Sequence, residues 1–266
     1  MKSGQSYHTI EDFLISHPLT IDVEIEDEWS GCFPVKGVEL EAAVLHVELD
    51  GYYRLLAELR PSEMLIYVNN FLAWTGAAAE RSACCVLHRY LDHAVVMLFA
   101  RKFGSADPFA DALGTARWLG EHDVLRFRPH MGIAVGKVTA GFTGIPKKYS
   151  ASVFGTPVMQ AAAFAGARPG REYIMRITVA SEAWGELSLE EMFPPVEYDD
   201  PRQGRRKEPQ TWELRGSRTV ETPVTGRIAV RDIVSFIHWM PDNTAEKKAR
   251  EWFAEIRKQG YYRAPS

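Results

Sequence analysis

One short segment limits what this chain can fold into more than any other. Residues 42–56, AAVLHVELDGYYRLL, pass from an apolar run typical of a buried strand into a helix-like stretch. Glu48 and Asp50 stand at the end of the strand, and Gly51 follows them. A carboxylate in that position is costly to desolvate unless a positive group pairs with it. Taken alone, the segment indicates a solvated strand end with a turn at Gly51.

The composition is that of an ordinary globular protein. The chain has 266 residues, of which 46% are hydrophobic and 25% charged, and its net charge of -4 argues against sequence-independent nucleic-acid binding. No apolar run approaches the ~20 residues of a membrane helix, and the N-terminus lacks the apolar stretch of a signal peptide. The cysteines, Cys32, Cys84 and Cys85, are too few for a disulfide framework. We therefore expect reduced thiols and a cytoplasmic location, with no membrane partner.

Strand and helix patterns alternate along the chain. We expect sheet strands around 44–49, 84–91, 94–99 and 129–135, with a hairpin turn at Asp92-His93. We expect helices within 52–79 (interrupted at Pro61), 108–122 and 152–165, and at the C-terminal end after an Asn-Thr cap. Residues 195–210 are polar and indicate a loop, and 211–215 indicate an edge strand. One sheet with helices packed on it accommodates this order, so we predict an α+β fold.

We divide the chain into three parts. Residues 1–36 form an N-terminal extension, residues 37–216 the principal domain, and residues 217–266 a C-terminal extension that ends in a helix. No internal repeat or low-complexity segment is present.

Two acids stand at the ends of separate strands, Glu48 before Gly51 and Asp92 in the hairpin turn. Carboxylates from neighbouring strands are ligands that Mg²⁺ or Mn²⁺ uses when substrate phosphates complete its shell. The backbone after Gly51 enters a helix, whose free N–H groups suit a triphosphate. On these residues alone, a metal site and two merely solvated acids are equally good interpretations.

Taken together, the segments resemble the catalytic domain of class III nucleotidyl cyclases. The resemblance covers about residues 38–216 and rests on four segments in the family's order: VLHVELDGYYRLLAELRPSEMLIYVNNFL, VLHRYLDHAVVMLF, MGIAVGKVTAGFTG and YSASVFGTPVMQAAAFA. It implies a ferredoxin-like antiparallel sheet with helices. It also implies that Glu48, the Leu49 carbonyl and Asp92 hold two divalent ions, Mn²⁺ or Mg²⁺. The resemblance further implies a head-to-tail homodimer, in which these acids of one subunit face segment 149–163 of the other.

The departures from the family concern the base and the transition state. His88 stands where purine cyclases place a base-reading Lys, and Ser150 where they place its partner. Met159 and Ala163 replace the Asn that orients the ribose and the Arg that steadies the pentavalent phosphate. This pattern resembles the pyrimidine cyclases of Pycsar antiphage systems. That resemblance implies conversion of UTP to cyclic UMP, a second messenger that acts on a separate effector.

Alternatives remain at this point. The residues leave UTP and CTP both open, and a catalytically inactive cyclase-homology domain that serves as a dimeric scaffold or nucleotide sensor would lose the same groups. Gly51 and the bulky side chains Tyr52, Tyr53, His88 and Tyr90 are candidate nucleotide-binding residues, although core packing is the simpler role for each tyrosine and especially for Tyr53.

Replacement cations and other metals are the last candidates. Arg89, Lys147, Lys148 and Arg171 are candidate phosphate cations, and strand alternation predicts that Arg89 points away from the face shared by His88, Tyr90 and Asp92. A zinc site and a Cys84–Cys85 redox pair are not expected, because no ligand spacing supports the first and neighbours on a strand point to opposite faces.

Overall fold

The structure is a computed structural model, and it describes residues 7–24, 34–123, 125, 127–145, 148–168, 175–195, 197–200, 204–207, 211–235 and 245–260. The principal helices are α1 (Ile10–Ser16), α2 (Tyr52–Glu58), α3 (Pro61–Glu80), α4 (Pro108–Glu121), α5 (Thr156–Gly166) and α8 (Ala245–Gln259). Short helical turns are η1 (Arg101–Phe103), α6 (Ser181–Trp184) and α7 (Leu189–Met192).

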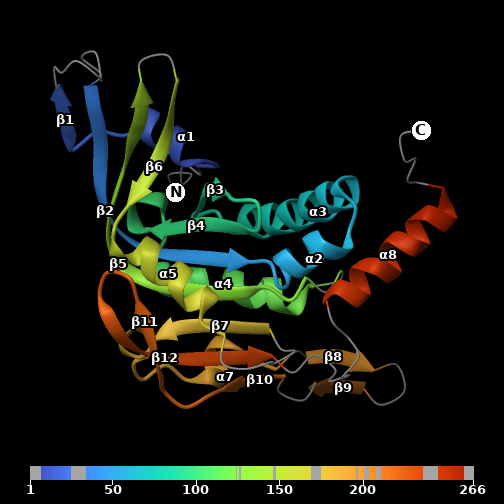
Figure 1. Cartoon of the computed structure of the whole chain (residues 1–266). Helices are drawn as coiled ribbons and strands as arrows, with labels where there is room; N and C mark the ends of the chain where they lie inside the picture. The colour runs from blue at the N-terminus through green and yellow to red at the C-terminus, as the bar shows by residue number, and fades with distance from the viewer. Residues whose placement is uncertain are drawn as a thin grey trace.

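Ten strands of the described chain form one sheet (Figure 1). Seven of them lie side by side in this order: β10 (Trp212–Leu214), β12 (Gly226–Ser235), β7 (Met175–Ala180), β5 (His130–Ile145), β2 (Pro34–Glu48), β4 (Ala94–Ala100) and β3 (Cys85–Tyr90). The others are β1 (Ile21–Glu24) beside β2, β6 (Lys148–Phe154) beside β5, and β11 (Arg218–Thr222) beside β12. All four strands that the sequence predicted for the sheet belong to it, so this prediction is confirmed.

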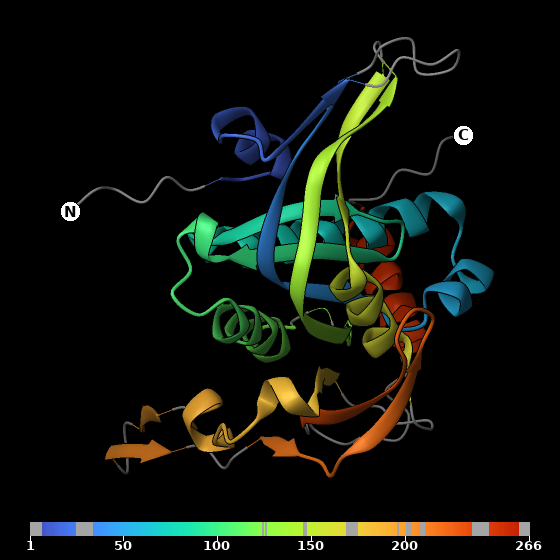
Figure 2. The same ribbon diagram turned by 90° about the vertical axis from the view of Figure 1, so that its left-hand side faces the viewer.

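The pairing in this sheet is antiparallel except between β5 and β7, which run parallel over 130–133 and 176–179. Figure 2 shows β2, β5 and β6 rising as a long arm from the rest of the sheet, and β1 lies beside β2 in this arm. The sheet curls enough that β6 approaches β3, although the two strands belong to opposite sides of the strand order.

Both faces of the sheet are buried because successive side chains of β2 alternate between two apolar layers. Leu45 and Val47 pack in one layer with Tyr67 of α3 and Leu113 of α4. Val44 packs in the other layer, which receives residues of α1 and α5, among them Phe13 and Phe164. The site residues described below stand at the rim of these layers.

The break between α2 and α3 is confirmed at the predicted proline. Pro61 is the first residue of α3, where its missing N–H costs nothing. The Glu63 carboxylate accepts a 3.1 Å hydrogen bond from the Arg60 amide, which closes the start of the helix.

The chain after residue 195 differs in part from expectation. Residues 195–210 were expected to be a loop, but they contain a short hairpin of β8 (Glu197–Asp200) and β9 (Gly204–Lys207), so that prediction is wrong. The proline and charged residues that suggested a loop do not exclude short, solvent-facing strands. The edge strand within 211–215 is confirmed as β10, whereas the predicted Asn-Thr cap lies outside the described residues.

Both extensions contribute to the packed structure. Residues of α1 lie in one apolar layer, and β11 and β12 belong to the sheet itself. Helix α8 packs against α2 and buries Ala249 and Phe253 (Figure 1). The boundaries at 36/37 and 216/217 remain predictions. Among the described helices, none combines the length and apolar character that crossing a membrane requires.

Candidate active site

The end of β2 and the turn between β3 and β4 lie side by side. In the register of β2 with β4, Glu48 stands opposite Ala94. The Leu49 amide then donates a 2.8 Å hydrogen bond to the carbonyl of His93. Since Asp92 precedes His93 in the turn, the two predicted metal-binding acids belong to adjoining segments at one end of the sheet.

A guanidinium that the sequence did not single out bridges two acids here. Arg168 Nη2 lies 2.6 Å from Glu48 Oε1, and Arg168 Nη1 lies 3.0 Å from Asp50 Oδ1. Asp50, which had no predicted role, is thereby joined to Glu48 through Arg168, and we call these three side chains the acid cluster. The sequence did contain one signal, because two acids at the end of a buried strand require a nearby cation. Which cation supplies the charge depends on tertiary structure.

Asp50 is the most strongly held acid of this cluster. Its Oδ1 lies 3.7 Å from Nε2 of the buried His130, and Arg54 Nη2 lies 3.5 Å from the same oxygen. Burial raises the pKa of Asp50, but His130, Arg168 and Arg54 outweigh it and lower the pKa below its usual value. Asp50 therefore remains ionised and keeps Arg168 beside Glu48.

Gly51 and the two tyrosines form the next part of the site. Gly51 has φ +69, and a Cβ there would lie 2.8 Å from Arg54 Nη2 and 3.0 Å from Glu246 Oε1 of α8, so glycine fits best. The Tyr52 ring lies 5.4 Å from that of Tyr53. Tyr53 is 74% exposed, so the expectation that it packs in the core is wrong.

The imidazole ring of His93, in the β3–β4 turn, lies next to these tyrosines. The His93 ring centroid lies 5.2 Å from that of Tyr52. On the neighbouring strand β2, burial lowers the pKa of His46 to about 4, and the charge of His93 acts in the same direction. His46 is therefore neutral at pH 7 and adds no cation to the acid cluster.

His88 and Ser150, the predicted base-reading residues, belong to strands that lie next to Glu11 of α1. Glu11 Oε1 accepts a 3.1 Å hydrogen bond from the Ala151 amide, next to Ser150. Burial and the charge of Arg89 lower the pKa of His88 to about 4, whereas the charge of Glu11 opposes this shift. His88 and Ser150 thus belong to segments that both adjoin α1. The sequence did not suggest Glu11, because α1 lay in the presumed extension.

A β-bulge separates His88 from Tyr90. The register of β3 with β4 shifts between Leu87 and Arg89, so Arg89 pairs with Val96 and Tyr90 with Val95. An extra residue reverses the alternation that follows it. Tyr90 consequently turns toward α3, where its hydroxyl lies 3.3 Å from the position of a Cβ on Gly76. The prediction that His88 and Tyr90 share a face is therefore wrong.

Tyr90 lines a hollow of about 390 Å³ with residues of α3, such as Glu80, and with residues that precede α1, such as Tyr7. Of the other cations proposed from the sequence, Lys148 is exposed on β6, and Lys147 and Arg171 lie outside the described residues. Among the described residues, neither Tyr90 nor Lys148 makes a hydrogen bond or ion pair with the acid cluster.

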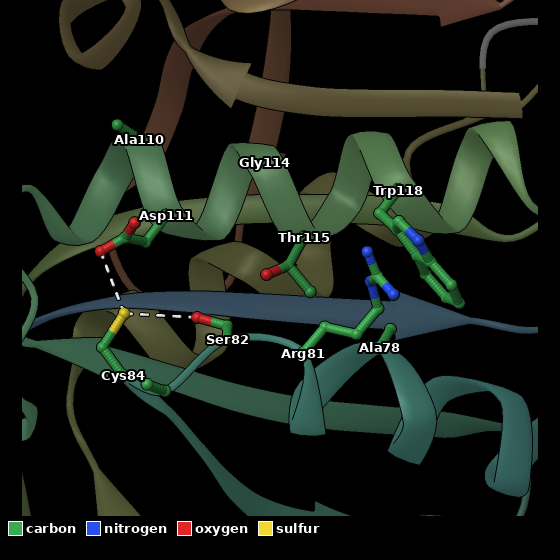
Figure 3. Close-up of a pocket in the computed structure, with 10 residues that line it drawn as sticks. Ala78, Arg81, Ser82, Cys84, Ala110, Asp111, Gly114, Thr115 and Trp118 are labelled. Carbon is green, nitrogen blue, oxygen red and sulfur yellow. Dashed lines mark hydrogen bonds between the residues drawn. The ribbon is translucent and has the colours of Figure 1, made fainter. Parts of the chain in front are cut away.

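The two neighbouring cysteines line separate hollows. Cys84 borders a hollow of about 420 Å³ between α3 and α4, where its Sγ donates a 3.1 Å hydrogen bond to Asp111 (Figure 3). In the same hollow, Arg81 lies 5.1 Å from the centre of the Trp118 ring. Cys85 is buried and borders the hollow of Tyr90 instead. Both thiols are free.

The oxygen donors at the end of β2 fit a hard divalent ion. Among the described residues, no group of three or more His, Cys, Asp and Glu side chains is arranged to hold a metal. Glu48, Asp92 and the Leu49 carbonyl offer oxygen atoms alone, which suits Mg²⁺ or Mn²⁺ when nucleotide phosphates supply further ligands. The chemistry of these donors is therefore compatible with a hard divalent ion that takes further ligands from a bound anion.

Several solved structures with similar architecture are nucleotide cyclases. The adenylyl cyclase CyaB from P. aeruginosa matches at 15% identity with a TM-score of 0.54, over 78% of this chain and 99% of that chain. The guanylyl cyclase Cya2 matches at 16% identity with a TM-score of 0.55, over 78% and 97%. The chain has the class III nucleotidyl cyclase fold. The prediction of fold class is thus confirmed.

A third structure of this fold is the guanylate cyclase domain of RhGC from Catenaria anguillulae in complex with GTP. It matches at 12% identity with a TM-score of 0.51, over 75% of this chain and 99% of that chain. Neither models of protein families nor curated protein sequences gave a match. At identities this low, the nucleotidyl cyclase fold is established and the reaction has to be argued from the site residues.

Proposed function

We propose that this chain is a pyrimidine nucleotide cyclase that converts UTP to 3′,5′-cyclic UMP and pyrophosphate. The observation that carries the proposal is the position of Glu48 and Asp92 on adjoining segments, tied together by the Leu49–His93 hydrogen bond within a cyclase fold. A domain that had lost catalysis would have no chemical need for both acids. Like charges placed close together repel unless cations accompany them.

In this proposal, Glu48, Asp92 and the Leu49 carbonyl hold two divalent ions, Mn²⁺ or Mg²⁺. When bound, such ions activate the ribose 3′-hydroxyl and stabilise the charge of the leaving pyrophosphate. The protein positions the nucleotide so that the 3′-oxygen attacks the α-phosphorus in line with that leaving group. The half-buried Tyr52 and the exposed Tyr53, next to Gly51, offer an aromatic wall for the nucleotide.

The choice of a pyrimidine rests on His88 and Ser150. Both side chains offer hydrogen-bond donors, and uracil presents two carbonyl oxygens that accept. Cytosine presents one carbonyl, so cyclic CMP from CTP is the near alternative. By resemblance to the pyrimidine cyclases of antiphage systems, the product acts as a second messenger on a separate effector in the cytoplasm.

The proposed enzyme is a head-to-tail homodimer. The segments of His88 and Ser150 adjoin Glu11, whereas Glu48 adjoins Arg168, so one chain offers two different half-sites. Apolar side chains at the surface of the second half-site support association: Met159 of α5 is 45% exposed and Phe154 of β6 is 57% exposed. In the dimer, the acids of each subunit face segment 149–163 of the other.

A dimeric scaffold or nucleotide sensor without catalysis is the second candidate. One observation favours it: Glu48, which an ion has to bind, already has Arg168 as its partner. Such a protein would bind a nucleotide through the same half-sites and release it unchanged.

One experiment separates these candidates. The purified chain is incubated with ATP, GTP, CTP or UTP and Mn²⁺, and the products are identified by mass spectrometry, with Glu48→Ala as the control. Cyclic UMP that depends on Glu48 supports the proposal, and cyclic CMP corrects the base. A purine product contradicts the assignment of His88 and Ser150. Nucleotide binding without any product favours the scaffold.

A further inference from the structure

Arg168 is placed to do more than neutralise two acids. Its guanidinium spans Glu48 and Asp50 with one nitrogen on each carboxylate, at 2.6 Å and 3.0 Å. The ion pairs are partly open to solvent, since the side chains of Arg168, Glu48 and Asp50 are 29%, 20% and 19% exposed. Small ions can therefore reach the cluster, and the arginine head has room to leave it.

The backbone that carries Arg168 is anchored on its N-terminal side. The Ala167 amide donates to Ala163 at the end of α5, and the Ala167 carbonyl accepts a 3.0 Å hydrogen bond from Arg218. Arg218 is itself held by the buried Asp232. A guanidinium released from Glu48 therefore stays tethered beside the site.

A divalent ion and Arg168 compete for the same carboxylate oxygen. Two cations within about 3 Å of one atom repel strongly in a partly buried place, where the effective dielectric constant is far below that of water. An ion bound to Glu48 consequently weakens the contact of Arg168 with that oxygen. The planar guanidinium, with its five N–H donors, then fits phosphate oxygens better than any other side chain does.

We propose that Arg168 is a displaceable counter-ion of the metal carboxylates, which yields Glu48 to the divalent ion and then contacts a phosphate of the bound nucleotide. The phosphate contact rests on the proposed function. Arg168 lies just beyond the end of α5, whose last turn contains Ala163 and no basic residue, so it supplies a cation at this helix end and within the same subunit. A purely structural ion pair would not be exchanged in this way.

A displaceable counter-ion and a purely structural ion pair predict different effects of removing Arg168 on the affinity for metal. Mn²⁺ binding to the full-length protein without nucleotide is measured from the electron paramagnetic resonance signal of free Mn²⁺. If Arg168 competes with the ion, Arg168→Ala and Arg168→Gln bind Mn²⁺ about tenfold more tightly than the wild type, the worth of one charge-assisted contact. Arg117→Ala, which removes a cation paired with Glu121 on α4, leaves the affinity unchanged. Unchanged or weaker binding in both Arg168 variants overturns the proposal, as does the absence of Mn²⁺ binding in all proteins.

Nucleotide binding supplies the second measurement. With Mn²⁺ in excess, Arg168→Ala is expected to bind an α,β-methylene analogue of UTP about tenfold more weakly than the wild type, because one phosphate contact is lost. Arg168→Lys is expected to recover part of this affinity. Equal affinity in wild type and Arg168→Ala overturns the phosphate contact. Circular dichroism and thermal unfolding verify that each variant is folded. If Arg168→Ala does not fold, Arg168→Gln replaces it in the binding measurement.

Failure of the inference and failure of the proposed function give different results. If Mn²⁺ binds more tightly to Arg168→Ala but no nucleotide is cyclised by any protein, the counter-ion role stands and the cyclase activity falls. If the wild type cyclises UTP but Arg168→Ala binds Mn²⁺ no more tightly, the activity stands and the counter-ion role falls.

Discussion

The amide of Leu49 donates a 2.8 Å hydrogen bond to the carbonyl of His93. This bond joins the end of β2 to the β3–β4 turn and so ties Glu48 to the segment of Asp92. Because the contact is made by the backbone, substitution of either acid leaves it in place. The acids can thus be removed one at a time without separating the segments that carry them.

The first prediction concerns these acids. Glu48→Ala and Asp92→Ala are each expected to lower cyclic nucleotide formation at least about 100-fold, because each removes an oxygen ligand that stabilises charge during the reaction. Product is quantified by mass spectrometry after incubation with UTP and Mn²⁺. Glu221→Ala, which removes an exposed carboxylate from β11, serves as the control and is expected to retain full activity. Normal turnover by Asp92→Ala would show that the second acid is assigned wrongly.

The second prediction tests the composite site. Asp92→Ala and His88→Ala disable different half-sites, so each protein alone is expected to be inactive. When equal amounts are mixed and exchange subunits, half of the dimers contain both variants and one of their two sites is intact. Activity should recover to about a quarter of the wild-type value, as the symmetry of a two-fold dimer requires. A mixture that stays inactive after verified subunit exchange contradicts the head-to-tail arrangement.

The third prediction uses the buried Asp232 of β12. Arg218 Nε lies 2.5 Å from Asp232 Oδ2, and Thr178 donates a 2.7 Å hydrogen bond to Oδ1. Burial raises the pKa of Asp232, but Arg218, Thr178 and Arg176 lower it below the usual 3.8. Because the folded pKa is lowered, this stabilisation is present above pH 3.8 and is lost as the pH falls through the folded pKa.

Asp232→Asn is therefore expected to lower the free energy of unfolding by about 3–5 kcal/mol at pH 7, since it leaves Arg218 without its charged partner. The difference from the wild type should shrink as the pH is lowered below 3.8, where the wild-type acid also becomes neutral. Urea unfolding at several pH values measures both effects. Asp22→Asn, which alters an exposed pair with Lys36, provides a control with a change of at most about 1 kcal/mol. If the difference in the free energy of unfolding between the wild type and Asp232→Asn does not change with pH, the ionised Asp232 is not the source of this stabilisation.

The fourth prediction compares two glycines. A Cβ on Gly132 of β5 would lie 2.0 Å from the Ala161 carbonyl oxygen and 2.7 Å from the Ala165 amide, so α5 packs directly on the strand backbone. Gly132→Ala must push α5 away, and it is expected to destabilise the protein by about 1–3 kcal/mol.

Gly114 of α4 is the matched control, because a Cβ there meets no atom within 4 Å. Gly114→Ala is expected to stabilise the protein by about 0.5–1 kcal/mol through helix propensity. Thermal and urea unfolding of the two variants check the difference in sign. Equal effects would show that α5 does not pack on Gly132 as the structure indicates.

The strands were predictable because their signal is local. The apolar runs of β3 and β4 and the polar turn at Asp92-His93 predicted the hairpin, which lies at the end of the strand order. The break before Pro61 was equally local, since a missing N–H ends a helix in any context. From these elements and their order an α+β fold could be predicted, and the resemblance of four segments to class III nucleotidyl cyclases supplied the fold family.

The site was less predictable because its contacts are not local. Arg168 is 120 residues away from Glu48 in the sequence, and no pattern of spacing relates them. The bulge at His88 adds one residue to β3 and so reverses the direction of Tyr90, which strand alternation alone cannot foresee. Likewise, Glu11 accepts its hydrogen bond from Ala151, next to Ser150, through the packing of α1, a segment whose sequence indicated only an extension.

The strand order of the sheet has a consequence for the synthesis of the chain. β10 is made before β12 but can join the sheet only through it, because β12 lies between β10 and β7. Until residue 235 has left the ribosome, the edge of β7 that pairs with β12 has no partner, and exposed strand edges invite pairing with other chains. Folding of this half of the sheet is therefore late, and a nascent chain that stalls after β10 is the species most prone to aggregate.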